Sequence, residues 1–265
     1  MKRFAFVSCA VAICVVVAGP VRAAFTGGNL VILTTASGTG DAASALTLNE
    51  FSYNSATGTF GTTPTAHSIT GLTLDGTNDH EGLLHLSTNG SYLVFGGYQA
   101  AVNTPSLIAS ASPRAIGVVD SNWNLTTTTI SDYTGLALRS VVSTDGKHFW
   151  TGGNQGGDGG QYYIDASGAL TQTLLTSGDA RGNRINDGQL WGFSSTTSGS
   201  LVGAGLPTSA VSQTSAMNSP FVKSDVVFLD LDHNGTSETA YSTDGKNLLG
   251  KWHFDGTTWT QTGSW

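Results

Sequence analysis

The sequence predicts an all-β protein, most simply a β-propeller with about five four-stranded blades. Three observations favour this fold class. Short runs of Val, Ile, Leu, Phe, Tyr and Trp, which suit pleated strands, recur along the whole chain. Asn-Gly or Asp-Gly pairs separate several of these runs, and the same phrase returns at intervals of roughly fifty residues. Helical periodicity is almost absent.

The recurring phrase is centred on a predicted tight turn. It reads S-T-N-G-S-Y-L-V-F-G-G from Ser87, S-T-D-G-K-H-F-W-T-G-G from Ser143 and S-T-D-G-K-N-L-L-G-K-W from Ser242, with a weaker copy, I-N-D-G-Q-L-W-G-F, from Ile185. Asn-Gly and Asp-Gly pairs accept positive φ at both central positions, so each copy predicts a two-residue hairpin turn. The turn glycines are Gly90, Gly146, Gly188 and Gly245.

A second strand–turn–strand phrase lies between these turns, as in A-I-G-V-V-D-S-N-W-N-L-T-T-T-T-I and Q-Y-Y-I-D-A-S-G-A-L-T-Q-T-L. Two hairpins in sequence give four strands, which is the content of one propeller blade. A blade buries its faces only by stacking on its neighbours. A β-sandwich or a β-solenoid is the alternative fold. The predicted units are 28–70, 80–132, 137–176, 182–215 and 221–265.

Two features of the first unit bear on the fold. Residues 41–51 admit either a helical turn or a strand, and a strand is preferred because it places Leu46 and Leu48 on one face. A five-bladed ring would close by pairing a first strand near 29–33 with the last strand. Otherwise the chain is part of a longer propeller, and an open ring exposes a strand edge.

The N-terminus predicts a secretory signal. Lys2 and Arg3 precede an apolar run over 4–18, and Val21-Arg22-Ala23 ends in a small residue. We therefore expect a signal peptide over 1–23, a propeller-like domain over 24–265, and an extracellular or periplasmic location. A retained N-terminal anchor is the alternative. The apolar run is too short to span a bilayer comfortably, so an integral membrane protein is not expected.

The positions of the cysteines and the net charge limit the reactions and the binding partners that we expect for the chain. Both cysteines lie within the predicted signal, so no disulfide and no thiolate chemistry is expected in the mature chain. The full chain has 11 basic and 18 acidic residues and a net charge of −7, and the signal removes three of the basic ones. An acidic secreted protein is a poor partner for nucleic acid or an anionic membrane.

Several stretches resemble a group of uncharacterised secreted bacterial proteins that are interpreted as propeller-like. These stretches are E-G-L-L-H-L-S-T-N-G-S-Y-L-V-F-G-G-Y-Q, P-R-A-I-G-V-V-D, R-S-V-V-S-T-D-G-K-H-F-W-T-G-G, V-V-F-L-D-L-D and G-K-W-H-F-D-G-T-T-W-T-Q-T-G. The resemblance covers most of the mature chain and implies the fold, not an activity. Many members of the group carry a C-terminal sorting signal. This chain shows no sorting helix or basic tail, and it stops at Trp265 after a blade-like hairpin.

The stretch D-L-D-H-N-G-T-S-E predicts a calcium loop. Oxygen ligands fall at alternate residues around the bend at Gly235, as a hard cation requires. The position of the closing acid resembles the integrin-type calcium loops of propeller blades rather than an EF-hand. A solvated acidic turn without an ion is the alternative. The candidate ligands are Asp230, Asp232, Asn234, the Thr236 carbonyl and Glu238.

Catalysis would need carboxylates gathered near the propeller axis. Asp79 and Glu81 are the candidates for a glycan- or lactone-active hydrolase, with Asp132 and Asp187 as further acids near unit edges. Against this interpretation, Asp and Glu here mostly occupy turns, where they bond their own backbone. An enzyme is therefore not the preferred interpretation.

Tryptophan distribution favours a binding role. Trp123 and Trp259 lie beside polar turns, where a flat ring could stack on a sugar. Trp150 and Trp191 lie within predicted strands and are expected in the core. The preferred function is a binding or surface-interaction module for a glycan or protein ligand, and the alternative is the hydrolase with axial carboxylates.

Overall fold

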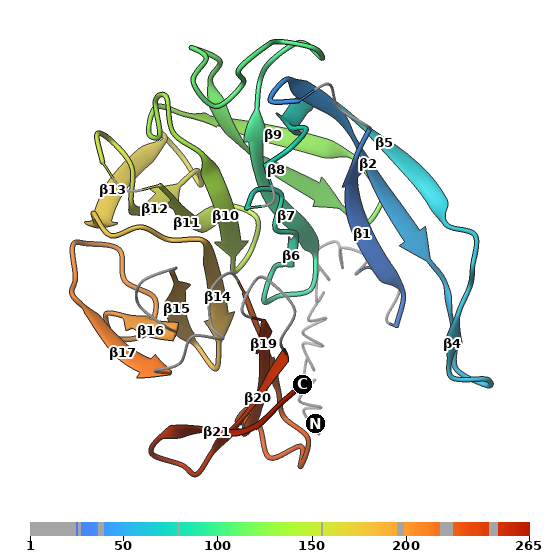
Figure 1. The fold of residues 1–265 in the computed structure, drawn as a ribbon, viewed down its shortest axis with the longest axis vertical. Helices are drawn as coiled ribbons and strands as arrows, with labels where there is room; N and C mark the ends of the chain where they lie inside the picture. Colours follow the sequence, from blue (N-terminus) through green and yellow to red (C-terminus); the bar gives the residue numbers. More distant parts are fainter. Residues whose placement is uncertain are drawn as a thin grey trace, which may run out of the picture.

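The fold consists of β-strands joined by turns and loops. A computed structural model describes residues 25, 28–36, 40–78, 80–154, 156–194, 199–217, 225–243 and 249–265. Within these ranges it contains 21 strands and no helix, which confirms the all-β prediction (Figure 1). None of the described ranges contains a helix with the length and hydropathy needed to cross a bilayer. The predicted signal peptide lies outside the described residues.

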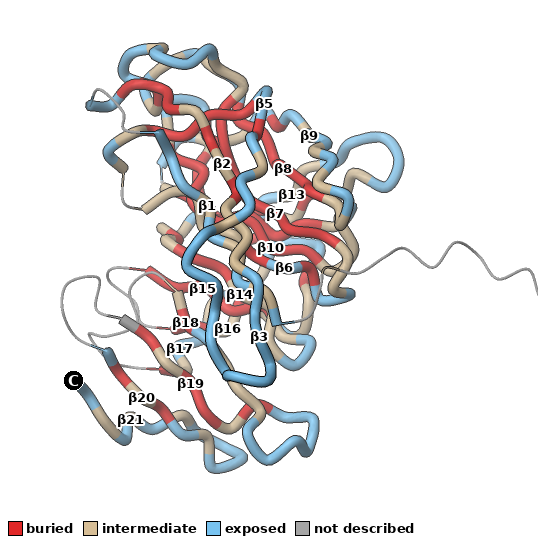
Figure 2. The backbone as a smooth tube through the Cα atoms, turned by 90° about the vertical axis from the view of Figure 1, so that its right-hand side faces the viewer, coloured by how far each residue is buried: buried red, intermediate tan, exposed pale blue. Residues whose placement is uncertain are grey.

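The first sheet is built from β1 (Leu30–Thr35), β2 (Ala43–Phe51) and β5 (Thr65–Asp75), paired antiparallel in that order. The strand prediction for residues 41–51 is confirmed, because Leu46 and Leu48 of β2 are both buried. Between β2 and β5, the short strands β3 (Tyr53–Asn54) and β4 (Thr59–Phe60) form a separate exposed hairpin (Figure 2).

The second group of strands forms an antiparallel meander that joins the first sheet. The pair Thr73 and Tyr98 links β5 to β7, so the first two predicted units share one seven-stranded sheet. A hydrophobic core cluster that includes Leu46, Leu72 and Phe95 holds the two parts together. The strands are β6 (His85–Leu86), β7 (Tyr92–Tyr98), β8 (Arg114–Asp120) and β9 (Leu125–Ile130).

Three further four-stranded sheets follow, each an antiparallel meander in chain order. The first contains β10 (Leu138–Ser143), β11 (His148–Gly153), β12 (Gln161–Asp165) and β13 (Thr171–Thr176). The second contains β14 (Gly182–Asn186), β15 (Gln189–Phe193), β16 (Gly199–Val202) and β17 (Gln213–Met217). The third contains β18 (Val226–Leu229), β19 (Thr239–Thr243), β20 (Leu249–Phe254) and β21 (Trp259–Ser264).

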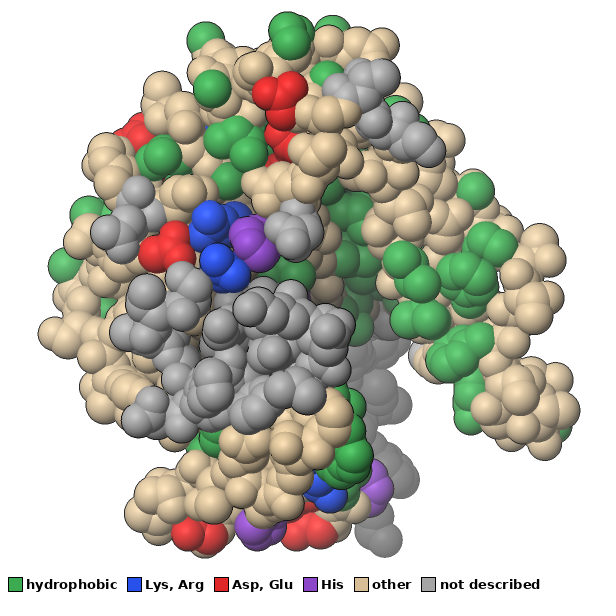
Figure 3. Space-filling view, in the orientation of Figure 1, with side chains coloured by type: hydrophobic (Ala, Val, Ile, Leu, Met, Phe, Trp, Pro, Cys, Tyr) green, Lys and Arg blue, Asp and Glu red, His purple; other side chains and the backbone are tan. Residues whose placement is uncertain are grey.

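The sheets follow one another along an arc (Figure 1). Neighbouring sheets contact each other, since β10 contacts β6 and β7, β14 contacts β10 and β11, and β17 contacts β21. Within the described residues no closed barrel or ring of sheets is found, and the expected pairing of first and last strands is absent: β1 pairs with β2, and β21 with β20. Hydrophobic side chains gather over the part of the molecule that holds β1 and β2 (Figure 3), and Leu30 and Ile32 of β1 are exposed.

The predicted turn geometry is correct at one copy of the phrase and wrong at two. Asp187 and Gly188 have φ of 48° and 72° and form a two-residue turn between β14 and β15. At the copies with Gly90 and Gly146, only the glycine has positive φ, and the loops are longer. The reason is side-chain chemistry: the Asp145 carboxylate accepts from the N–H groups two and three residues ahead, at 2.9 Å each, and this fixes a wider turn. The turn at Gly245 lies outside the described residues.

Candidate functional site

An aromatic cavity lies between the last two sheets. It has a volume of about 380 Å³, and strands β15, β16 and β17 form one wall. The other wall is the β20–β21 hairpin. The lining residues are Trp191, Leu201, Ser215, Ala216, Phe254, Thr257, Thr258 and Trp259. The cavity therefore combines aromatic rings with hydroxyl groups.

Trp259 is the centre of the aromatic group. Its ring lies 5.2 Å from Phe254 with an interplanar angle of 26°, and 5.3 Å from Phe228 at 67°. The Trp191 ring meets it edge-on, at 6.3 Å and 86°. Trp191 is 5% exposed, as expected for a core tryptophan, whereas Trp259 is half-buried. The predicted ligand-binding residue Trp259 thus has a defined orientation at the wall of a cavity.

A tight turn holds the hydroxyl groups at the cavity rim. The Asp255 carboxylate accepts from the backbone N–H groups of Thr257 and Thr258, at 2.8 Å each, and from the Thr258 hydroxyl at 3.2 Å. These hydrogen bonds hold the pKa of Asp255 below its ordinary value, and the bond from the Thr258 N–H contributes most. The carboxylate is therefore ionised over the physiological pH range and can accept all three hydrogen bonds.

Trp123, the other predicted ligand-binding residue, lies in the first sheet and is not brought together with Trp259. Its ring stacks on His67 with centroids 3.6 Å apart and an angle of 6°, and Phe25 packs edge-on at 5.6 Å. The backbone of Trp123 has a φ of 64°, and Trp123 is the fourth residue of the turn that begins at Asp120, to whose carbonyl its N–H donates. One face of this ring is already covered, so it is a poorer platform for a ligand.

The candidate acid Glu81 lines a second, polar cavity of about 290 Å³, beside the ends of β1 and β5. The buried Tyr98 hydroxyl donates to Glu81 Oε1, and the Asp75 N–H lies 3.5 Å from Oε2. Burial raises the pKa of Glu81 to about 7, although the hydrogen bond from Tyr98 opposes this. Asp79, its predicted companion, lies outside the described residues.

Asp75 is the functional candidate that sequence reasoning missed. It ends β5, is 5% exposed and lines the same cavity as Glu81. Its Oδ1 accepts from the Thr77 N–H at 2.9 Å, the Thr77 hydroxyl at 3.0 Å and the Asn78 N–H at 3.0 Å. The available signal was an Asp directly after the apolar run G-L-T-L, followed by Gly-Thr-Asn.

The two other acids named from the sequence do not line this cavity. Burial raises the pKa of Asp132 to about 6, with a smaller contribution from the charge of Asp158. Asp187 accepts hydrogen bonds from Asn186 and from the Ser237 N–H, both at 2.9 Å. Asp187 therefore has a structural role, because it ties the turn after β14 to the loop after β18.

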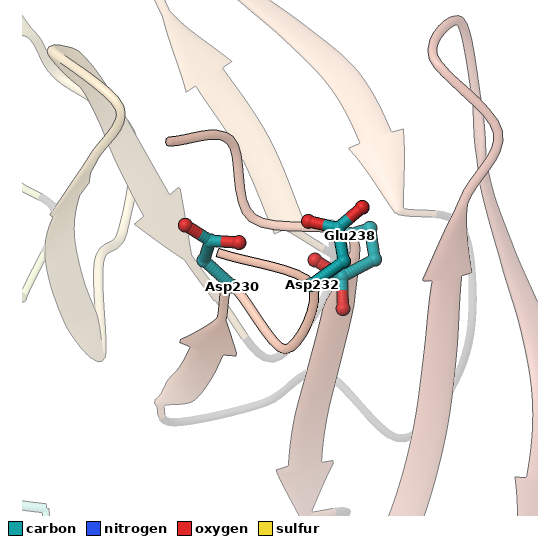
Figure 4. Close-up of side chains that lie close together, drawn as sticks. All are labelled: Asp230, Asp232 and Glu238. Carbon is teal, nitrogen blue, oxygen red and sulfur yellow. The ribbon is translucent and has the colours of Figure 1, made fainter. Parts of the chain in front are cut away.

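The predicted calcium loop brings three carboxylates together. Ligand atoms of Asp230, Asp232 and Glu238 lie within 4.8 Å of one another (Figure 4). Desolvation acts to raise the pKa of Asp230, but the hydrogen bond from Gly235 N–H and others from the loop backbone outweigh it, and the pKa lies below its ordinary value. The Asn234 amide oxygen accepts from the Thr236 N–H at 2.9 Å. Carboxylates gathered on a tight turn fit a hard cation.

The comparisons with known proteins identify no family for this chain. No protein-family model matches the chain, and a search of curated proteins finds no match. The fold defines an all-β protein of antiparallel sheets. Among the described residues, the aromatic cavity, the polar cavity and the acidic loop are candidate functional sites.

Proposed function

We propose that the chain is a secreted, propeller-like protein that binds a glycan in the aromatic cavity between its last two sheets. The observation that carries this proposal is the position of Trp259, half-buried at the cavity wall and braced by Phe254, Phe228 and Trp191. A braced aromatic ring is a low-entropy platform for the C–H face of a sugar. A protein ligand is the competing partner class.

The polar groups of the cavity favour a sugar over a purely apolar ligand. Ser215, Thr257 and Thr258 add hydroxyl groups beside the rings. Small-molecule sites usually combine a mainly apolar wall with a few polar groups, in volumes of ~300–1,000 Å³. A cavity of about 380 Å³ is at the lower end of that range, so we expect it to take one terminal sugar unit rather than a long chain.

The propeller-like interpretation is supported by the sheets. Three consecutive sheets are four-stranded antiparallel meanders. The leading strands β10 and β14 of the first two pack together, and β17 contacts β21 of the third. Stacking of such units is how propeller blades bury their faces. Secretion is supported by the signal-like pattern of residues 1–23.

Calcium is the cofactor that we propose for the loop after β18. Asp230, Asp232 and Glu238 would supply carboxylate oxygens, and Asn234 and the Thr236 carbonyl would complete the set. The loop is tied to the preceding sheet through Ser237, whose hydroxyl donates to Asn186 at 2.9 Å. An ion there would stiffen the last sheet, which forms one wall of the aromatic cavity.

A glycan array followed by calorimetric titration tests the proposal. The purified protein should bind at least one class of glycan, and Trp259→Ala should weaken that binding by roughly tenfold or more, given ~0.5–1.5 kcal/mol for ring stacking in addition to the lost buried area. Trp265→Ala is the matched control, since Trp265 is 63% exposed and does not line the cavity. Equal losses in the two variants, or no glycan bound, would contradict the proposal.

A further inference from the structure

The polar cavity beside β1 and β5 places two carboxyl groups in one wall. Its lining combines these acids, Asp75 and Glu81, with the Thr34, Thr35 and Thr77 side chains and the Asn78 amide. Its volume of about 290 Å³ is just below the ~300 Å³ at which small-molecule sites usually begin, so a single sugar ring is the largest unit that we expect it to take. It lies on the first sheet, away from the aromatic cavity between the last two sheets.

The two carboxyl groups have different surroundings. Three donors fix Oδ1 of Asp75, while its Oδ2 accepts no hydrogen bond from the described residues. Asp75 is 5% exposed and lines the cavity, so Oδ2 is the atom available to a molecule bound there. Glu81 instead accepts at Oε1 from the neutral Tyr98 hydroxyl, and the Asp75 N–H lies 3.5 Å from its Oε2.

Tyr98 keeps Glu81 in one orientation. Its ring is fully buried, and the Arg114 guanidinium lies 4.9 Å from the ring centroid. Burial and the neighbouring Glu81 charge raise the pKa of Tyr98 well above its ordinary value, so its hydroxyl keeps its proton and donates. Tyr98 holds Oε1, whereas Oε2 has only the long, 3.5 Å contact with the Asp75 N–H, so Oε2 is the oxygen that would carry the proton.

We propose that this cavity is an acid–base site that hydrolyses a glycosidic bond, with Glu81 as the acid and Asp75 as the base. Two carboxyl groups with different surroundings are the arrangement that such a reaction uses. The raised pKa of Glu81, about 7, agrees with the assignment of the acid. Threonine hydroxyls and the Asn78 amide would bind the sugar hydroxyl groups.

The proposed step balances without a cofactor. Asp75 takes a proton from a water molecule, whose oxygen attacks the anomeric carbon. The bond from that carbon to the leaving oxygen breaks with its electron pair, and Glu81 gives its proton to the leaving oxygen. The products are a free sugar and an alcohol. A proton then passes from Asp75 to Glu81 through solvent and restores both groups.

Hydrolysis of a panel of 4-nitrophenyl and methyl glycosides by the purified protein tests this site. We expect wild type to cleave at least one sugar class, and Asp75→Asn to lower kcat by roughly 10²–10⁴-fold. Glu81→Gln should impair methyl glycosides much more than nitrophenyl ones, because nitrophenolate leaves without a proton. A residue with only a structural role would lower both rates equally.

The controls separate this proposal from glycan binding at the aromatic cavity. Trp265→Ala should leave the rates unchanged, and circular dichroism should show each variant folded. Failure of wild type to cleave any glycoside of the panel, or equal rates in wild type and both carboxyl variants, would overturn the acid–base site. Neither result would affect glycan binding that depends on Trp259.

Discussion

The clearest energetic consequence of the structure is a pH-dependent stability that originates at Glu81. Its pKa rises from an ordinary value of 4.5 to about 7, mainly because the carboxyl is buried. Each pH unit of such a difference corresponds to about 1.4 kcal/mol. Ionised Glu81 should therefore destabilise the folded state by about 3 kcal/mol relative to a freely solvated carboxylate.

The direction follows from proton binding. Between pH 4.5 and about 7 the folded state holds a proton on Glu81 that the unfolded state has released. Unfolding therefore becomes easier as pH rises through this window, and the loss is complete somewhat above pH 7. Glu81→Gln keeps the shape and removes the titration, so it should abolish this part of the pH dependence.

Urea unfolding at pH 5 and pH 8 measures this effect. The difference in unfolding free energy between the two pH values should be about 2.5 kcal/mol larger for wild type than for Glu81→Gln, because at pH 5 the unfolded carboxyl is already mostly ionised. The same substitution at Glu238, which lies outside the polar cavity, should leave the wild-type difference in place. If Glu81→Gln and wild type lose the same stability between pH 5 and pH 8, the burial argument for Glu81 is wrong.

Three further predictions concern packing and ion binding. Arg114 is 2% exposed and donates to four backbone carbonyl groups, so Arg114→Met should lower the unfolding free energy by about 3 kcal/mol or more in urea titrations. A Cβ at Gly153 would lie 2.3 Å from the Ala137 carbonyl oxygen and 2.5 Å from the Tyr133 ring. Gly153→Ala should therefore lower the unfolding free energy by about 1–3 kcal/mol in the same assay. An unchanged urea midpoint would show that the backbone shifts to make room for the methyl group. Calcium at a hundredfold excess over its Kd should raise the unfolding free energy of wild type by about 2.7 kcal/mol in thermal melts, and Asp232→Asn should remove this increase. If the wild-type midpoint is the same with calcium and with chelator, the loop is an ordinary turn without an ion.

Strand positions could be predicted from the sequence because local signals determine them. Alternation of Leu46 and Leu48 identified β2, and both side chains are buried. The turn glycines correctly separated the strands on either side of them. Trp150 and Trp191 were expected in the core, and they are 3% and 5% exposed. These features depend on residues close in the chain, which a sequence displays directly.

The joining of the first two units could not be predicted, because it depends on contacts distant in sequence. The pair Thr73–Tyr98 that links β5 to β7 has no local signal. The wide turn at Gly146 was missed because Asp145 uses its carboxylate to bond the backbone ahead instead of adopting positive φ. In both cases the residue types allow more than one pairing or turn, and contacts formed in the folded protein decide between them.

Some site residues could likewise be identified from the sequence, and others only from the fold. Glu81 was a candidate because it lies near the edge of a predicted unit, but the ends of β1 and β5 form its polar cavity only after folding. Asp75 was missed because, as a strand-ending Asp, it matches an ordinary turn residue. Trp123 and Trp259 had equal claims as surface aromatics, and only the fold distinguishes the ring stacked on His67 from the ring that lines a cavity.

A crystal structure with a glycan selected from the array is the decisive test of sugar binding at Trp259. We expect electron density for a sugar ring stacked on Trp259, within hydrogen-bond reach of Thr257 or Thr258, between β17 and β21. Density at Trp123 or on an open sheet face, with the aromatic cavity empty, would show that Trp259 is not the sugar-binding residue.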